Sequence, residues 1–154
     1  MKKITLVLDN IRSVFNVGSI FRTADAVGDT EIYLCGITAT PENPKITKTS
    51  LGAEKNIPYK YFNNTLDAIN ELKKQNSPIY GIELHEKSKN FQEFEYFKET
   101  DNIAMVFGHE KNGISEPILD KCDTILYIPM KGKKESLNVA ITASILMYEV
   151  MRYN

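Results

Sequence analysis

Cysteine and histidine are scarce in this chain of 154 residues, which has two of each. Cys35 and Cys122 lie far apart and form no CxxC pair, and neither histidine stands at zinc-ligand spacing from a second donor. The sequence therefore predicts two reduced thiols in a cytoplasmic protein and no metal site.

Long apolar runs and a strong excess of one charge are also missing. No stretch approaches the roughly 20 apolar residues that a membrane-spanning helix needs, and Met1–Lys3 leads directly into a strand-like stretch that is too short for a secretory signal. The net charge is −1, whereas proteins that hold nucleic acid mainly through phosphate contacts are usually basic. We therefore expect no membrane partner and no general binding of polyanions.

Short apolar runs alternate with helical patterns along the whole chain. Strands are expected at Ile4–Leu8, Glu31–Cys35, Tyr59–Phe62, Ile79–Leu84, Ile103–Phe107 and Ile125–Ile128. Helices are expected at Val17–Val27, Thr65–Lys74, Glu116–Cys122 and Leu137–Arg152, and the longest loop at Thr38–Thr49. This alternation predicts an α/β fold, with a mostly parallel sheet flanked by helices on both faces and residues 1–154 forming one domain.

The last expected helix is apolar on two sides. One stripe consists of Leu137, Ile141, Ser144, Ile145 and Tyr148, and the other of Val139, Thr142, Leu146, Val150 and Tyr153. A helix that is apolar on both sides must be covered on both sides, and the sheet covers only one of them. The second cover is expected to be another copy of the chain, in a homodimer. A fold-back of the same chain is the alternative.

Two small polar residues follow a strand end near the C-terminus. Proline in Ile128-Pro129-Met130 stops the strand, because it supplies no ladder donor and restricts the residue before it. Ser136 is then placed to cap the last helix, and Asn138 lies in its first turn. Open α/β sheets bind ligands at such strand-to-helix junctions, although both side chains are also explained as caps alone.

Two upstream segments also lie just after or at the end of expected strands. Residues Asn16–Arg22 read NVGSIFR, and residues Phe107–Ser115 read FGHEKNGIS. Together with Ser136-Leu137-Asn138-Val139-Ala140, in this order, they resemble the three motifs of the SpoU-type (TrmH-like) branch of the SPOUT RNA methyltransferases. The resemblance covers nearly the whole chain.

This resemblance implies a homodimeric, cytoplasmic RNA 2′-O-methyltransferase that uses S-adenosylmethionine and acts on tRNA or rRNA. It also implies a deep C-terminal trefoil knot, in which the segment from about residue 125 threads under the preceding loops. The cofactor would lie bent in the knot with its adenine read by backbone groups. The positions that match the cofactor site of the family are Leu84, Gly108, Ile128 and Leu137.

The matching catalytic positions are Asn16, Arg22, Glu110, Ser136 and Asn138. The family arginine acts on the ribose 2′-hydroxyl and has been proposed as the base. Arginine has a pKa above ~12 and keeps its proton in proteins, so we expect Arg22 to bind a phosphate or the developing alkoxide instead. Asn16 is expected to cap the first helix and to shape the ribose site. Glu110 is expected to orient Arg22 or the substrate.

Some of these residues have simpler explanations. Arg22 is also explained by an ion pair with Asp25, three residues further along the same helix. His109 stands where relatives vary, and we expect it to be a supporting or solvent-facing residue rather than an acid or base. His85 is expected to be a loop residue at a strand end.

Lysine is in excess in two loops that flank the motifs, Pro41–Tyr61 and Met130–Ser136, which each have a net charge of +2. Such runs are often only solvated surface, but their position makes them candidates for contact with RNA. The lysines are Lys45, Lys48, Lys55 and Lys60 in the first loop and Lys131, Lys133 and Lys134 in the second. Two other functions stay open: a non-catalytic RNA-binding or assembly factor that keeps the fold, and a SPOUT enzyme that methylates a base nitrogen.

Overall fold

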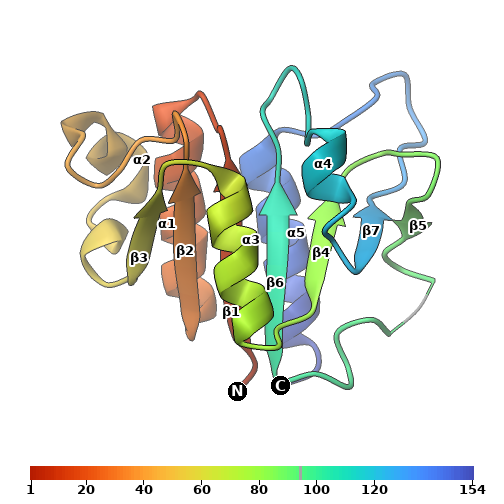
Figure 1. The fold of residues 1–154 in the computed structure, drawn as a ribbon. Coiled ribbons are helices and arrows are strands. Elements are labelled where there is room, and N and C mark those ends of the chain that lie inside the picture. Colours follow the sequence, from red (N-terminus) through yellow and green to blue (C-terminus); the bar gives the residue numbers. More distant parts are fainter. Residues whose placement is uncertain (94) are drawn as a thin grey trace.

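One parallel sheet organises the fold. In the computed structural model, which describes residues 1–93 and 95–154, seven strands have the order β3-β2-β1-β6-β4-β7-β5, and all neighbouring strands are parallel (Figure 1). The strands are β1 Lys3–Asp9, β2 Thr30–Cys35, β3 Tyr59–Phe62, β4 Ile79–Ile82, β5 Lys89–Asn90, β6 Asn102–Phe107 and β7 Thr124–Tyr127. The expected strands are thus confirmed, whereas β5 was not predicted because it is two polar residues long.

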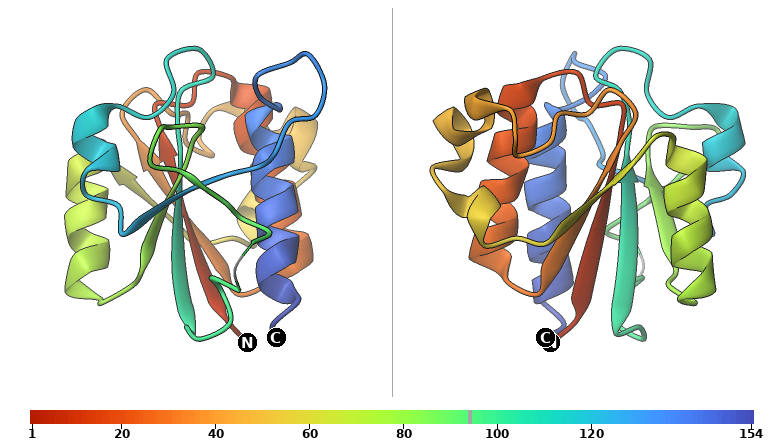
Figure 2. Two further views of the ribbon diagram at one scale, coloured as in Figure 1. Left: turned by 90° about the vertical axis from the view of Figure 1, so that its right-hand side faces the viewer. Right: turned by 60° about the vertical axis from the view of Figure 1, so that its left-hand side comes forward.

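Helices cover both faces of the sheet, as the alternating pattern predicted. Helices α1 and α5 lie side by side on one face, and α3 and α4 lie on the other (Figure 2). The α-helices are α1 Val14–Val27, α2 Thr47–Ser50, α3 Thr65–Lys74, α4 Glu116–Leu119 and α5 Val139–Met151, and two 3₁₀ turns, Pro44–Ile46 and Ala53–Lys55, flank α2. The expected loop Thr38–Thr49 therefore contains a 3₁₀ turn and the start of α2, and α4 is shorter than expected.

The core lies in two layers, one on each side of the sheet. Successive side chains of a strand point to opposite faces, so Leu6 and Leu8 of β1 are buried against the α1 and α5 side, while Val7 is buried against α3 and α4. All three are fully buried. The strands are apolar without alternation because both faces are covered.

Two helix starts differ from the prediction. Helix α1 begins at Val14 and is capped by Ser13, whose hydroxyl accepts a hydrogen bond from the backbone N–H of Asn16, so Asn16 is not the cap. Helix α5 is capped by Asn138 and not by Ser136, because the Asn138 side-chain oxygen accepts from the N–H groups of Ala140 and Ile141. In each case a residue with an extended backbone satisfies N–H groups that the first helical turn leaves free.

Helix α5 is buried on one side only. Leu146 and Val150 are fully buried, whereas Ile141 and Tyr148 are 52% and 53% exposed. The structure therefore agrees with two apolar sides but leaves one of them uncovered. Within residues 1–93 and 95–154, no helix is long and apolar enough to cross a membrane.

Candidate active site

Three loops meet at the carboxyl edge of the sheet, because all of its strands run in the same direction. They follow β4, β6 and β7 and surround a cavity of about 580 Å³, which we name the loop cavity. Its volume lies in the range of small-molecule sites, roughly 300–1,000 Å³. The predicted site residues that line it are Leu84, Gly108, Glu110, Ile128, Ser136, Leu137 and Asn138.

Gly108 is required by the shape of the turn that follows β6. A Cβ atom at this position would lie 2.5 Å from both the carbonyl carbon of Gly113 and the nitrogen of Ile114. The turn is closed by a 2.8 Å hydrogen bond from the Gly113 N–H to the His109 carbonyl. As a cofactor position, Gly108 was expected to allow the close approach of a ligand. The structure shows that its missing side chain also makes room for the backbone of Gly113 and Ile114 in its own loop.

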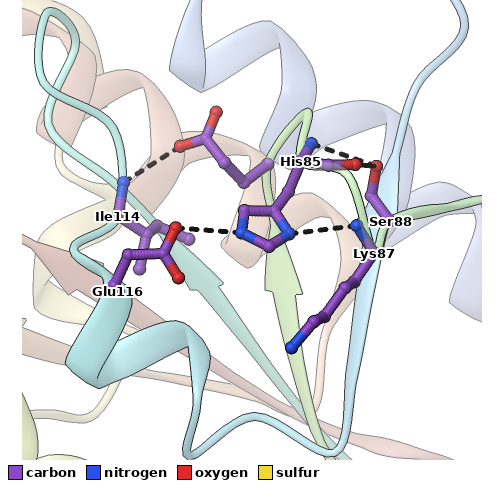
Figure 3. Close-up of polar contacts among 6 residues, drawn as sticks. His85, Lys87, Ser88, Ile114 and Glu116 are labelled. Carbon is purple, nitrogen blue, oxygen red and sulfur yellow. Dashed lines mark hydrogen bonds and ion pairs between the residues drawn. The ribbon is translucent and has the colours of Figure 1, made fainter.

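The two histidines of the chain hold loops. His109 accepts hydrogen bonds at Nδ1 from the N–H groups of Lys111 and Asn112, both at 3.1 Å, so its ring organises its own turn. His85 lies after β4, as predicted, and Figure 3 shows its ring between Glu116 and Lys87. Its Nε2 lies 2.9 Å from the Glu116 carboxylate, and its Nδ1 accepts from the Lys87 N–H at 3.1 Å.

Glu83 is a cavity residue that the sequence reasoning missed. It lines the loop cavity, and its carboxylate accepts a 2.9 Å hydrogen bond from the Ile114 N–H. Together with the contact between His85 and Glu116, this bond ties the loop after β4 to the segment that enters α4 (Figure 3). The available signal was an acidic side chain near the end of the apolar run Ile79–Leu84, outside all three motifs.

Glu110 holds the start of helix α1. Its carboxylate accepts hydrogen bonds from the N–H groups of Arg12 at 3.0 Å and Ser13 at 2.9 Å. Burial by itself raises the pKa of this carboxyl, but hydrogen bonds from backbone N–H groups and from the Asn16 side chain together hold the pKa below its ordinary value of 4.5. Glu110 therefore stays ionised near neutral pH and connects the turn after β6 to the segment that caps α1.

A second cavity, of about 590 Å³, lies between α1, α2 and the start of α5, and we name it the helix cavity. Asn16 and Arg22 line it, and Asn138 lines both cavities. The Asn138 amide donates a 3.0 Å hydrogen bond to the side-chain oxygen of Asn16. The five predicted catalytic residues therefore divide between two adjoining cavities that share Asn138.

Arg22 is exposed and makes no hydrogen bond or ion pair with any residue that the structure describes. Asp25, its alternative partner, instead accepts a 3.1 Å hydrogen bond from the Asn56 amide. Glu110 contacts the backbone before α1 rather than Arg22. The guanidinium is therefore available to a ligand in the helix cavity.

Both cysteines are free thiols. Burial raises the pKa of Cys35 and of Cys122 to about 12, so both remain protonated at neutral pH. In the described part of the chain, no group of three or more His, Cys, Asp or Glu side chains is placed to hold a metal ion.

The chain is similar to RNA-modifying enzymes over almost its whole length. Residues 3–148 match the SpoU rRNA Methylase family. The tRNA (guanosine(18)-2′-O)-methyltransferase of Thermus thermophilus is 34% identical over 149 residues, which cover 97% of this chain and 74% of that enzyme.

Two solved structures show the same fold. The AdoMet-bound rRNA methyltransferase from Sinorhizobium meliloti is 27% identical with a TM-score of 0.90, and the match covers 98% of this chain and 56% of that one. The TrmH/SpoU tRNA modifying enzyme of A. aeolicus is 30% identical with a TM-score of 0.84, and the match covers 99% and 76%. The chain thus spans between about half and three quarters of the length of these proteins.

Proposed function

The chain belongs to the SpoU rRNA methylase family, and from this premise we propose that it is a cytoplasmic RNA 2′-O-methyltransferase that uses S-adenosylmethionine. The family assignment confirms the resemblance seen in the three motifs. The observation that carries the proposal is the meeting of all three motifs around two adjoining cavities that share Asn138. Two free, protonated thiols suit the reducing cytoplasm.

The loop cavity suits the cofactor in size and charge. S-adenosylmethionine supplies a methyl group on a positively charged sulfur. Three carboxylates line the cavity against one lysine, so its charge favours a cation; these residues are Glu83, Glu110, Glu135 and Lys111. The partly exposed side chains of Leu84 and Leu137 offer apolar surface for the adenine ring.

The helix cavity suits the ribose and its phosphate. Asn16 and Asn138, joined by their hydrogen bond, would position the ribose at the boundary between the cavities. Arg22 would bind the adjacent phosphate or stabilise the oxygen as it loses its proton. Glu110 would hold the start of α1, and therefore Arg22, in a fixed position relative to the loop cavity. Ser136 lines the loop cavity and would support the cofactor side.

The test is the identity of the methylated product. The protein is incubated with S-adenosylmethionine labelled in its methyl group and with total RNA from cells that lack the gene, and the RNA is digested to nucleosides. We expect label in a 2′-O-methyl nucleoside, whose 3′ phosphodiester resists alkali. Label only in N-methylated bases would falsify the proposal, and unlabelled RNA would favour a binding or assembly factor.

We further propose that the protein acts as a homodimer through the outer faces of α1 and α5. These neighbouring helices present large apolar side chains to solvent: Phe15 is 49% exposed and Tyr148 53%. A 2.9 Å hydrogen bond between Thr23 and Ser144 joins the two helices. An uncovered apolar face of this kind favours a second copy as its cover.

Sedimentation at micromolar concentration tests the dimer. Leu146 and Val150 face the core, so a charge at either would unfold the chain rather than probe an interface. Tyr148→Asp is the suitable change and should give a folded monomer. Leu66→Asp, at a 41% exposed leucine on the opposite side of the sheet, is the matched control and should stay dimeric. A monomeric wild type would contradict the proposal.

We also propose that residues 1–154 form one methyltransferase domain with a deep trefoil knot. Strand β7 lies between β4 and β5, which are consecutive in sequence, and the chain then continues to α5 on the α1 face. This order of strands supports threading of the C-terminal segment, which is rare in proteins. Pulling the chain from both ends should give a final length below the ~3.3–3.6 Å per residue of an open chain. Full extension would exclude the knot.

A further inference from the structure

We propose that Lys48 is a substrate-binding residue, which together with Arg22 holds a phosphate of the RNA backbone beside the target ribose. Both side chains line the helix cavity, and Lys48 belongs to none of the three motifs. The inference rests on the proposed function and extends it, because it names the chemical group of the substrate that this cavity takes.

Gly18 brings helix α2, and with it Lys48, onto helix α1. A Cβ atom at Gly18 would lie 2.1 Å from the Thr49 hydroxyl and 2.5 Å from the Ile46 carbonyl oxygen, so only glycine permits this approach. The Thr49 hydroxyl also donates a 2.8 Å hydrogen bond to the Phe15 carbonyl. Lys48 is the neighbour of Thr49, and Arg22 lies one turn beyond Gly18 on α1. The close contact of the two helices therefore sets two cations around one cavity.

The charge of the helix cavity is not compensated. No carboxylate is found among the described residues that line it, and neither Lys48 nor Arg22 forms an ion pair with any described residue. Lys60, from the same lysine-rich segment Pro41–Tyr61, lies in strand β3, 3.7 Å from the Glu71 carboxylate and over the ring of Tyr33. Two cations without an acidic partner in one concave site favour an anion.

A phosphodiester is the anion that the neighbouring groups select. Asn138 stands at the boundary with the loop cavity, where the accepting 2′-hydroxyl has to meet the methyl group. In RNA the 3′-phosphate is attached to the carbon next to the one that carries this hydroxyl, so it would follow the ribose into the helix cavity. Arginine can grip a phosphate with two parallel donors, and lysine adds a compact charge. The site therefore prefers an RNA chain to a free nucleoside.

The experiment compares Lys48→Ala with Lys74→Ala. Lys74 is an exposed lysine on helix α3, on the opposite face of the sheet, and it does not line the cavity. The probe is total tRNA labelled with fluorescein at its 3′ end, used for binding, and the same RNA unlabelled, used for methyl transfer. Lys48→Ala should weaken RNA binding and raise KM about tenfold, the effect of losing one charged hydrogen bond. The slope of log affinity against log salt should fall by about 0.7–0.9, the share of one phosphate.

Three controls make the result decisive. Lys48→Arg should restore binding, and S-adenosylmethionine affinity measured by calorimetry should be unchanged in every variant. The proposal is overturned if Lys48→Ala binds RNA with the affinity and salt slope of Lys74→Ala, or if it loses cofactor affinity in parallel. If the wild type forms no 2′-O-methyl nucleoside but its RNA binding depends on Lys48, the phosphate site stands and the proposed reaction fails.

Discussion

The two cavities that meet at Asn138 are built in different ways. The loop cavity is formed by segments that leave the carboxyl ends of β4, β6 and β7, and a tight glycine turn shapes it. The helix cavity is formed by the faces of α1, α2 and α5, brought together by the close approach at Gly18. Acidic side chains predominate in the first, whereas Arg22 and Lys48 are the charged side chains of the second.

This difference separates two tasks of the proposed reaction. A sulfonium cofactor and a phosphodiester carry opposite charges, so in the proposed reaction each would favour the cavity whose charge is opposite to its own. Asn138 belongs to both cavities and bonds to Asn16, and in the proposed reaction the two reactants would be aligned at this boundary. Variants that damage one cavity and spare the other test this division.

Removal of Arg22 should have the largest effect. Arg22→Ala should lower methyl transfer by about 10²–10³-fold, the usual loss when one preorganised donor to developing charge is removed. S-adenosylmethionine affinity should stay near that of the wild type, because Arg22 lies outside the loop cavity. Arg22→Lys keeps the charge but not the paired donors and should recover part of the rate. A collapse of cofactor affinity in calorimetry would show that the two cavities are not separate.

Asn138 should affect both cavities. Asn138→Ala removes the cap of α5 and should cost about 1 kcal/mol of unfolding free energy, measured by urea denaturation. Asn138→Asp keeps the capping oxygen but loses the amide that donates to Asn16. We expect it to be nearly as stable as the wild type and about tenfold slower, the effect of one lost hydrogen bond. Equal activity of the aspartate variant and the wild type would remove the bond to Asn16 from the mechanism.

Three glycine substitutions test whether the two cavities act separately. Gly108→Ala should weaken cofactor binding and Gly18→Ala should raise KM for RNA, each with a loss of about 1–3 kcal/mol of stability from overpacking. Gly132→Ala is the control, since nothing lies within 4 Å of a Cβ at that loop position. Calorimetry with the cofactor and kinetics with RNA give the two readouts. Identical defects from Gly108→Ala and Gly18→Ala would argue for a single site.

The smallest effect should come from the ionisation of Glu110. Its pKa in the folded protein lies below the ordinary value of 4.5, so its stabilisation is present above pH 4.5 and is lost as the pH falls through the folded pKa. The free energies of unfolding of the wild type and of Glu110→Gln, measured by denaturation, should therefore differ most above pH 4.5 and converge in acid. If this difference in free energy did not change with pH, the contribution of Glu110 would come from packing and not from its charge.

Prediction from the sequence succeeded where a signal is local. Apolar runs located the strands. The resemblance gave Leu84, Gly108, Ile128 and Leu137 as cofactor positions, and all four line one cavity. Prediction failed at helix starts, where Asn16 and Ser136 were expected as caps but Ser13 and Asn138 hold these positions. Several neighbouring residues can cap a helix, and only the backbone angles choose between them. It also missed β5, whose two residues have no pattern of their own.

The sequence by itself determined the family, the parallel α/β architecture and the chemical identity of the residues in the three motifs, since each is written in a short stretch of chain. Only the tertiary structure decided that Glu110 accepts hydrogen bonds from the backbone before α1 and that Glu83 accepts one from the Ile114 N–H. It also decided that, of the four lysines in Pro41–Tyr61, Lys48 lines the helix cavity. The physical reason is that such contacts join segments distant in sequence. Their partners are selected by packing, here by a glycine that lets two helices touch.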